Sequence, residues 1–359
     1  MTDAPGRSGS VERPIFVVGS MRSGSTLLRL MLDSHEDIAI PPETGFMGAL
    51  SATRKIPNFK YGDTWFERIG WSAAELDDRL RDFYSEMFSR YAIAQGKSRW
   101  GEKTPSHTWH LAAMSEVFPD AQFVAIVRHP GAVAASLRDR FHYTFADGVA
   151  YWDEINRELL RRAGELGPRI LLCRYEDLVH GPAAVLRRML ARLGVPWSAA
   201  VLAHHEVQAE RGSPRMSDGS TISRDSVDPD RASTWVSLLT DGDRKVLTER
   251  AGPLADLLGY DVQHPATGPG DDPLRDGVGI AAQLAEAGFD LGTRRPVVEP
   301  DADPVDLARR LDLAEAALAR LRRRRIVRLG DAVRRVQRNR SLSDLRDAFH
   351  VLRERPRRP

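Results

Sequence analysis

Cysteine is almost absent from this 359-residue chain, in which Cys173 is the single example. One cysteine forms no internal disulfide and no thiolate metal cage, which excludes a disulfide scaffold and a zinc finger. Long apolar runs are also lacking, so no segment reaches membrane-spanning length. Residues 1–13 are polar and lack the apolar stretch of a signal peptide. We therefore expect a cytoplasmic protein.

Charges of opposite sign nearly cancel over the whole chain, to a net charge of +2, but they are unevenly distributed. Residues 306–359 hold 17 arginines against seven acidic residues, so this segment carries +10 and the remainder carries −8. The segment has no lysine and Phe349 is its one aromatic residue, a composition that gives nucleic-acid binding no support. Apolar residues spaced by four and three over 307–321 predict an amphipathic helix. Such a helix is compatible with a dimer contact, with a membrane surface or with a solvated extension.

Short, continuously apolar segments alternate with amphipathic stretches from Pro14 onward. We expect buried strands at 14–19, 38–40, 121–127 and 169–173. Strands of this kind, separated by helices, predict an α/β fold with a P-loop-like parallel sheet flanked by helices on both faces.

The domain organisation follows from changes in composition along the chain. We expect a disordered N-terminus over 1–12, an α/β domain over 13–262, a mobile Gly/Pro/Asp-rich linker over 263–304, and an Arg-rich helical tail over 305–359. One short helix is expected inside the linker, near Ile280.

The most informative segment runs from Gly19 to Thr26, between the first strand and its helix. Backbone N–H groups and the positive end of the helix dipole favour an anion there. The glycine spacing matches a P-loop, yet Ser25 occupies the position of the essential lysine, and Arg22 is the loop's cation. The absent lysine disfavours a kinase or an ATPase.

Several segments resemble the sulfotransferases that use 3′-phosphoadenylyl sulfate (PAPS). Residues 14–28 resemble their 5′-phosphosulfate loop, in the Arg-Ser-Gly form of tyrosylprotein sulfotransferases and many bacterial enzymes, and residues 123–136 resemble their 3′-phosphate motif. Residues 175–178 resemble the family's Tyr-Glu-Asp-Leu segment, whose position suits contact with the nucleotide. The resemblance implies that the donor is held by Arg22, Ser23, Gly24, Ser25, Thr26, Arg128, Ser136 and Tyr175. Arg140 lies on the same helix face as Ser136, four residues later, and is predicted to join Arg128 at that phosphate.

Sulfuryl transfer needs a base for the acceptor hydroxyl and a cation for the departing oxygen. The resemblance implies that Glu43 is the base and that Lys103 is the cation, with Arg22 as its companion. His107 is the alternative base, while Glu102 is expected to orient its neighbours. No metal site is predicted.

We therefore expect a PAPS-dependent sulfotransferase that acts on a hydroxyl of a small-molecule, carbohydrate or lipid acceptor, with peptide tyrosine also open. The alternatives are a P-loop-like phosphotransferase and a non-catalytic nucleotide-binding adaptor. A polar segment over 213–235, with Ser223 and Arg231, is a weaker candidate for a loop that closes over the substrate.

Overall fold

The computed structural model describes residues 13–56, 64–211, 225–266, 268, 270 and 272–292. Through Leu291 the described residues cluster into one compact unit. The predicted disordered N-terminus over 1–12, the helical tail over 305–359 and Ser223 lie outside the described residues. Among the described helices, none combines the length and the apolar character needed to cross a bilayer.

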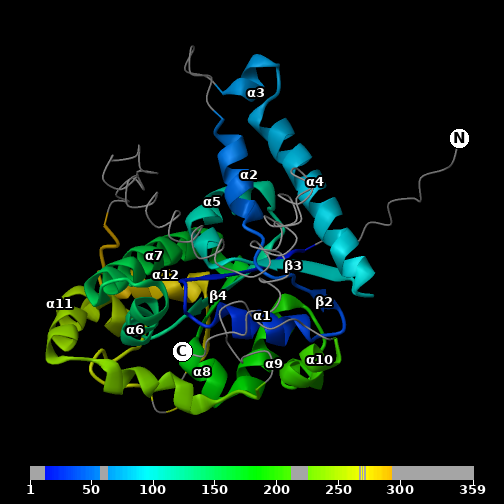
Figure 1. Cartoon of the computed structure of the whole chain (residues 1–359). Coiled ribbons are helices and arrows are strands. Elements are labelled where there is room, and N and C mark those ends of the chain that lie inside the picture. The colour runs from blue at the N-terminus through cyan, green and yellow to red at the C-terminus, as the bar shows by residue number, and fades with distance from the viewer. Residues whose placement is uncertain are drawn as a thin grey trace, which may run out of the picture. The chain divides into compact units, whose positions relative to one another are not determined.

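A six-stranded sheet with the order β2-β3-β1-β4-β5-β6 forms the centre of this unit (Figure 1). Its strands are β1 (Ile15–Gly19), β2 (Ile38–Ala39), β3 (Arg99–Lys103), β4 (Gln122–Val127), β5 (Ile170–Arg174) and β6 (Leu274–Asp276). Neighbouring strands are parallel, except that β6 runs antiparallel to β5. The predicted α/β fold with a parallel-dominated sheet is confirmed.

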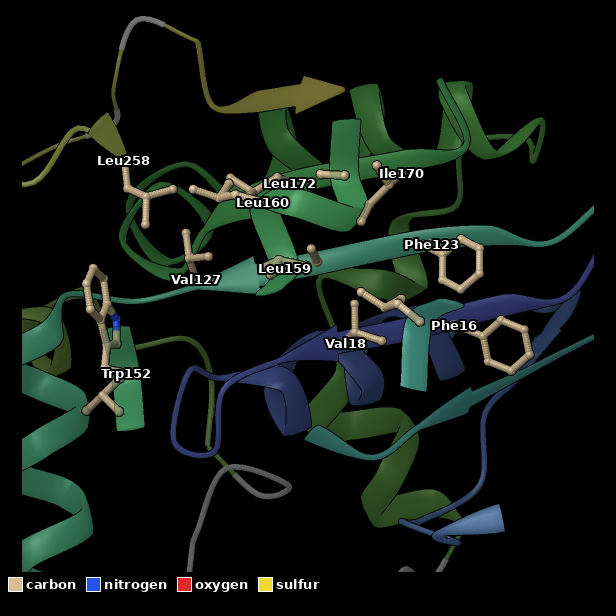
Figure 2. Packing of buried hydrophobic residues seen from close by; sticks show 14 of the residues in the cluster. Phe16, Val18, Phe123, Val127, Trp152, Leu159, Leu160, Ile170, Leu172 and Leu258 are labelled. Atoms are coloured by element: carbon tan, nitrogen blue, oxygen red, sulfur yellow. The ribbon is translucent and has the colours of Figure 1, made fainter. Parts of the chain in front are cut away.

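Both faces of the central strands are covered, which explains why β1 and β4 are apolar without alternation. Phe16, Val18 and Phe123 belong to a cluster that residues of α4 to α7 and α11 complete, and Figure 2 shows the rings of Phe16 and Phe123 side by side. Ile15 belongs to a second cluster on the opposite face, which α1, α8 and α9 complete.

Helices surround the sheet in the order that the sequence alternation predicts. The α-helices are α1 (Ser25–Asp33), α2 (Phe46–Arg54), α3 (Trp65–Arg68), α4 (Ala73–Ala94), α5 (Leu111–Val117), α6 (Pro130–Phe141), α7 (Phe145–Leu166), α8 (Tyr175–His180), α9 (Pro182–Leu193), α10 (His204–Glu210), α11 (Asp241–Leu257) and α12 (Gly277–Glu286). The 3₁₀ helices are η1 (Pro105–His110), η2 (Gly167–Arg169), η3 (Ala199–Val201), η4 (Pro229–Ala232) and η5 (Thr234–Leu238).

β3 was not predicted as a strand, because Trp100 is its only large apolar residue. Its polar residues Glu102 and Lys103 are nevertheless buried, with 1% and 2% of their surfaces exposed. After β3 the chain forms the 3₁₀ helix η1, and the Thr104 side chain does not cap it. The Thr104 hydroxyl is used elsewhere, in a hydrogen bond to Glu102.

The segment assigned to a linker over 263–304 contains regular structure where it is described. β6 pairs with β5, with Leu172 opposite Arg275. α12 follows at the place where a short helix was expected, and its Ile280 is buried in the same core cluster as α7. The described part of the segment is therefore packed against the sheet, while residues 293–304 lie outside the described residues.

Candidate active site

The turn between β1 and α1 lies at the carboxyl ends of the parallel strands, where such sheets bind ligands. Gly24 caps α1 with φ of +99°, a left-handed conformation that favours glycine. A Cβ atom at this position would lie 2.3 Å from Cδ2 of Tyr175. The turn is therefore pressed against the Tyr175 ring, and any larger residue would displace one of them.

Backbone N–H groups of the first turn of α1 are available to an anion. No side chain caps this end of the helix, and the first-turn N–H groups have no helical acceptor. The hydroxyls of Ser20 and Ser23 are buried without a hydrogen-bond partner among the described residues. Arg22 has φ of +65°, a strained conformation for a residue with a side chain. Together these features form a cradle for a phosphate or sulfate group.

The Arg22 side chain reaches the second predicted motif. Its Nε donates to Oγ of Ser136 on α6, at 2.9 Å. Arg128 follows the end of β4, and its Nη1 donates to the Arg22 carbonyl at 3.3 Å. The Arg128 guanidinium also stacks over the Tyr175 ring, 4.3 Å from its centroid. The structure therefore brings together four of the side chains that the sequence assigned to the donor.

Arg128 has further contacts that hold its guanidinium in place. Nη2 donates to the carbonyl of Arg231 in η4, at 2.9 Å, whereas the buried Nε has no partner among the described residues. Arg231 thus meets the site through its backbone. Arg140 is exposed at the end of α6 with its Nε 3.6 Å from Asp139, so its predicted convergence with Arg128 is not seen in this arrangement.

A second group of predicted residues gathers beside the helix start. Nζ of Lys103 donates to Oγ1 of Thr26 at 3.2 Å and to Oε1 of Glu43 at 2.5 Å. Burial lowers the pKa of the Lys103 ammonium, and the Glu43 carboxylate partly offsets this effect. The side chain of Glu43 is 52% exposed, against 2% for Lys103. A solvent-accessible carboxylate therefore lies directly beside a buried cation.

The alternative base, His107, has a different environment. Its ring is 1% exposed, and Nδ1 lies 2.6 Å from Oε2 of Glu102. The other carboxylate oxygen of Glu102 accepts from the hydroxyls of Thr44 and Thr104, at 2.9 and 2.7 Å. Thr44 is the residue after Glu43, so this network orients the backbone that carries the candidate base.

Behind the Tyr175 ring, a buried carboxylate supports the strand ends. Oε1 of Glu176 accepts the His129 N–H at 3.0 Å, and Oε2 accepts the Tyr260 hydroxyl at 2.8 Å. Burial raises the pKa of Glu176 and lowers that of His129 to about 4. Arg174 forms a bidentate ion pair with Asp177. The contacts of the residues that flank Tyr175 are therefore structural.

Three residues at the site were missed by sequence reasoning. The Tyr151 hydroxyl accepts the Met21 N–H at 2.9 Å. Nε1 of Trp152 donates to the Arg128 carbonyl at 2.8 Å. Oγ1 of Thr108 accepts the Gly19 N–H at 2.9 Å. An aromatic pair in a helix and a threonine in a 3₁₀ turn carry no motif, so no local signal marks them.

Metal ligands are not gathered in the part of the chain that the structure describes. We find there no group of three or more His, Cys, Asp or Glu side chains arranged to hold an ion. Among the described residues, the cations of Arg22, Lys103 and Arg128 lie beside the turn and the start of α1.

Comparisons with known proteins identify the family. A model of the sulfotransferase family matches residues 14–199, just over half of the chain. Nodulation protein NoeE of Sinorhizobium fredii is 28% identical over 282 residues, covering 69% of this chain and 67% of that protein. Protein-tyrosine sulfotransferase 1 of Danio rerio is 26% identical over 258 residues, covering 69% of this chain and 72% of that protein.

Among solved structures, the sulfotransferase domain of the Synechococcus PCC 7002 olefin synthase is 23% identical, with a TM-score of 0.49, and the match covers 71% of this chain and 98% of that domain. The family model includes the β1–α1 turn, Glu43, Lys103, Arg128 and Tyr175 within its matched range. The chain belongs to the sulfotransferase family.

Proposed function

We propose that this enzyme transfers a sulfuryl group from PAPS to a hydroxyl group of its acceptor. The observation that carries the proposal is the direct connection between the two arginines. Arg22 and Arg128 share one hydrogen bond through the Arg22 carbonyl, and Arg22 also holds Ser136. Two arginines from separate motifs are therefore in direct contact, an arrangement that suits a donor with two phosphate groups.

The residues present fit such a donor. Uncapped amides at the start of α1 suit its 5′ end, and the unpartnered hydroxyl of Ser23 is an additional donor there. Arg128, whose Nε is also unpartnered among the described residues, suits the 3′-phosphate. When bound, PAPS supplies an activated sulfuryl group on a phosphate leaving group.

Glu43 and Lys103 supply complementary chemistry beside this region. In the proposed transfer the acceptor oxygen forms a bond to sulfur while the bond between sulfur and the 5′-phosphate oxygen breaks. The hydroxyl proton passes to Glu43, and the electron pair remains on the phosphate oxygen, near Lys103. Lys103 has three N–H donors, so it contacts Thr26 and Glu43 and retains one for that oxygen.

Glu43 is a better base than His107 on geometric grounds. A base must reach the proton that it removes, and the Glu43 carboxylate is half exposed. His107 is enclosed and its Nδ1 is engaged by Glu102. We therefore assign His107 and Glu102 to orienting the segment that follows Glu43.

The acceptor is proposed to be a hydroxyl compound of small-molecule, carbohydrate or lipid type, with protein tyrosine included because relatives are named protein-tyrosine sulfotransferases. Phe46, three residues beyond Glu43, is 38% exposed and packs its ring against Tyr84 and Phe88. The partly exposed ring of Phe46 is therefore close in the chain to the candidate base, which favours acceptors with an apolar part.

The test is substitution of Glu43 by Gln. We expect turnover to fall by about 10²- to 10⁴-fold, as for loss of a general base, while binding of adenosine 3′,5′-bisphosphate persists. Glu86→Gln, on the exposed face of α4 where Glu86 pairs with Arg90, is the matched control and keeps full activity. Sulfated products are followed by mass spectrometry, with phenolic, carbohydrate and lipid hydroxyls as acceptors.

Titration calorimetry distinguishes the other functions. A sulfotransferase prefers adenosine 3′,5′-bisphosphate to ADP, whereas a phosphotransferase prefers ADP with magnesium. Preference for ADP contradicts the proposed donor. An adaptor that binds nucleotide without catalysis forms no sulfated product even in the wild type. Unchanged sulfation in Glu43→Gln contradicts the proposed role of Glu43.

A further inference from the structure

Two consecutive residues of α7 hold the two halves of the proposed donor site. Tyr151 accepts the Met21 N–H at 2.9 Å, in the residue before Arg22. Burial raises the pKa of the Tyr151 hydroxyl to about 12, so this group remains neutral near neutral pH. One partly buried hydroxyl thus ties the proposed anion-binding turn to a helix.

Trp152 makes the corresponding contact with the other half. Its ring is fully buried, and Nε1 donates to the Arg128 carbonyl at 2.8 Å. Indole nitrogen is a donor only, and a buried donor without a partner is costly, so this contact selects one position for the strand end. Arg128 in turn stacks on Tyr175, which packs against the turn.

Successive side chains on a helix point about 100° apart, so neighbouring residues reach different partners. Here one reaches the turn and the next reaches the end of β4. No glycine or proline interrupts α7 between Val149 and Ala163. The spacing of the two anchors is therefore that of a regular, rigid stretch of helix.

A third contact brings the same helix close to Ser136. Gly148 of α7 lies so near α6 that a Cβ atom there would be 2.9 Å from Cα of Ala134. Ser136, the hydroxyl partner of Arg22, is two residues further along α6. α7 therefore contacts the turn, the end of β4 and the part of α6 that carries Ser136.

We propose that Tyr151 and Trp152 are positioning residues that set the distance between the turn at 20–24 and Arg128. This role rests on the proposed PAPS-dependent function, because it concerns the simultaneous capture of two phosphate groups on one nucleotide. Correct spacing favours binding at both ends together, whereas a ligand with one phosphate is insensitive to it.

The experiment compares three nucleotides by titration calorimetry: adenosine 3′,5′-bisphosphate, AMP, which carries only the 5′-phosphate, and adenosine 3′-monophosphate. In Tyr151→Phe we expect affinity for the bisphosphate to fall about fivefold to tenfold, as for one lost hydrogen bond, while each monophosphate changes by less than about twofold. Tyr143→Phe is the matched control, because its ring lies 6.4 Å from that of Tyr151, and its affinities are expected to stay unchanged.

Trp152→Phe provides a second test from the other anchor. It leaves the Arg128 carbonyl without its indole donor, so the same selective loss for the bisphosphate is expected. Because Trp152 is fully buried, thermal unfolding is measured alongside. If that variant does not fold, Tyr151→Phe decides the question, since it removes only a hydroxyl group.

The outcomes separate this role from the proposed function. If AMP loses as much affinity as the bisphosphate in Tyr151→Phe, the hydroxyl supports the turn locally and the spacing role is overturned. If Tyr151→Phe prefers the bisphosphate to the monophosphates as strongly as the wild type does, the spacing role is also overturned, but the proposed donor is unaffected. A wild-type enzyme that binds the bisphosphate no more tightly than AMP overturns both.

Discussion

Gly24 offers a sharp test of the donor site, because its replacement by alanine perturbs two separable quantities. The first is conformational: a residue with a Cβ at φ of +99° costs ~1–2 kcal/mol. The second is steric: the added Cβ would lie 2.3 Å from Cδ2 and 2.9 Å from Cε2 of Tyr175. Crowding of this kind in a packed site costs ~1–3 kcal/mol. We therefore expect Gly24→Ala to lower the free energy of unfolding by ~2–5 kcal/mol.

Gly45 provides the matched control, because it caps α2 in a similar left-handed conformation, with φ of +70°. A Cβ atom at Gly45 meets nothing within 4 Å. Gly45→Ala should therefore lose only the conformational part, ~1–2 kcal/mol, and keep its affinity for the nucleotide. The difference between the two variants measures the contact between Gly24 and Tyr175.

Nucleotide affinity should respond at Gly24 alone, since the displaced Tyr175 ring is the one on which Arg128 stacks. We expect affinity for adenosine 3′,5′-bisphosphate to fall at least about tenfold, equivalent to ~1.4 kcal/mol. Adding Tyr175→Ala to Gly24→Ala removes the steric part, so a double-mutant cycle should show coupling of ~1–3 kcal/mol. Denaturation and calorimetry measure both quantities. Equal effects of Gly24→Ala and Gly45→Ala on stability and affinity would refute the reasoning.

Three further predictions address the charged groups. Ser136→Ala should weaken bisphosphate binding about tenfold, because Arg22 loses the hydroxyl that orients its guanidinium. Arg22→Lys should weaken this binding more, because an ammonium group lacks the planar set of donors of a guanidinium. Calorimetry measures both affinities. In Glu43→Gln the pKa of Lys103 should fall further, because the carboxylate that raises it is gone. As pH rises above neutral, the variant should therefore lose bisphosphate binding at a lower pH than the wild type does. An unchanged pH profile of binding would argue against the pairing of Glu43 with Lys103. Tyr260→Phe removes a hydrogen bond from buried Glu176 and should raise the pKa of that carboxyl further. The variant should lose ~1–3 kcal/mol of stability at neutral pH, and less at acid pH, where Glu176 binds a proton. Chemical denaturation at the two pH values measures this difference.

The sequence predicted the strands that consist mainly of apolar residues. β1, β4 and β5 are apolar on both faces, so their pattern is visible without knowledge of their neighbours. β3 is different, because Lys103 is buried with the distant partners Thr26 and Glu43, and Glu102 is buried with Thr44 besides its near neighbours Thr104 and His107. β6 has three residues and pairs antiparallel at the edge of the sheet. Its strand conformation depends on β5, and the surrounding Gly/Pro-rich composition favoured a linker instead.

The candidate site was predictable where its residues follow the ends of strands. Arg128 comes directly after an apolar segment, while Arg22 and Glu43 each follow one by three residues. Parallel strands bring such positions to one edge of a sheet. The pairing of Glu43 with Lys103 was harder to infer, because β3 itself was not recognised as a strand. The β1–β3 register places Lys103 opposite Val17, and this register brings its ammonium to the start of α1.

The distance between the two arginines depends on residues that no motif marks. Tyr151 and Trp152 fit the apolar stripe of an amphipathic helix, as core aromatic residues usually do. What distinguishes Trp152 from a buried phenylalanine such as Phe123 is one N–H group, which must find an acceptor when it is buried. That acceptor is the Arg128 carbonyl, more than twenty residues earlier in the chain, and only the packing of α7 against the sheet brings the two together. The proposed recognition of an anion therefore depends on local residues, whereas the spacing between the two proposed anion sites is a property of tertiary structure.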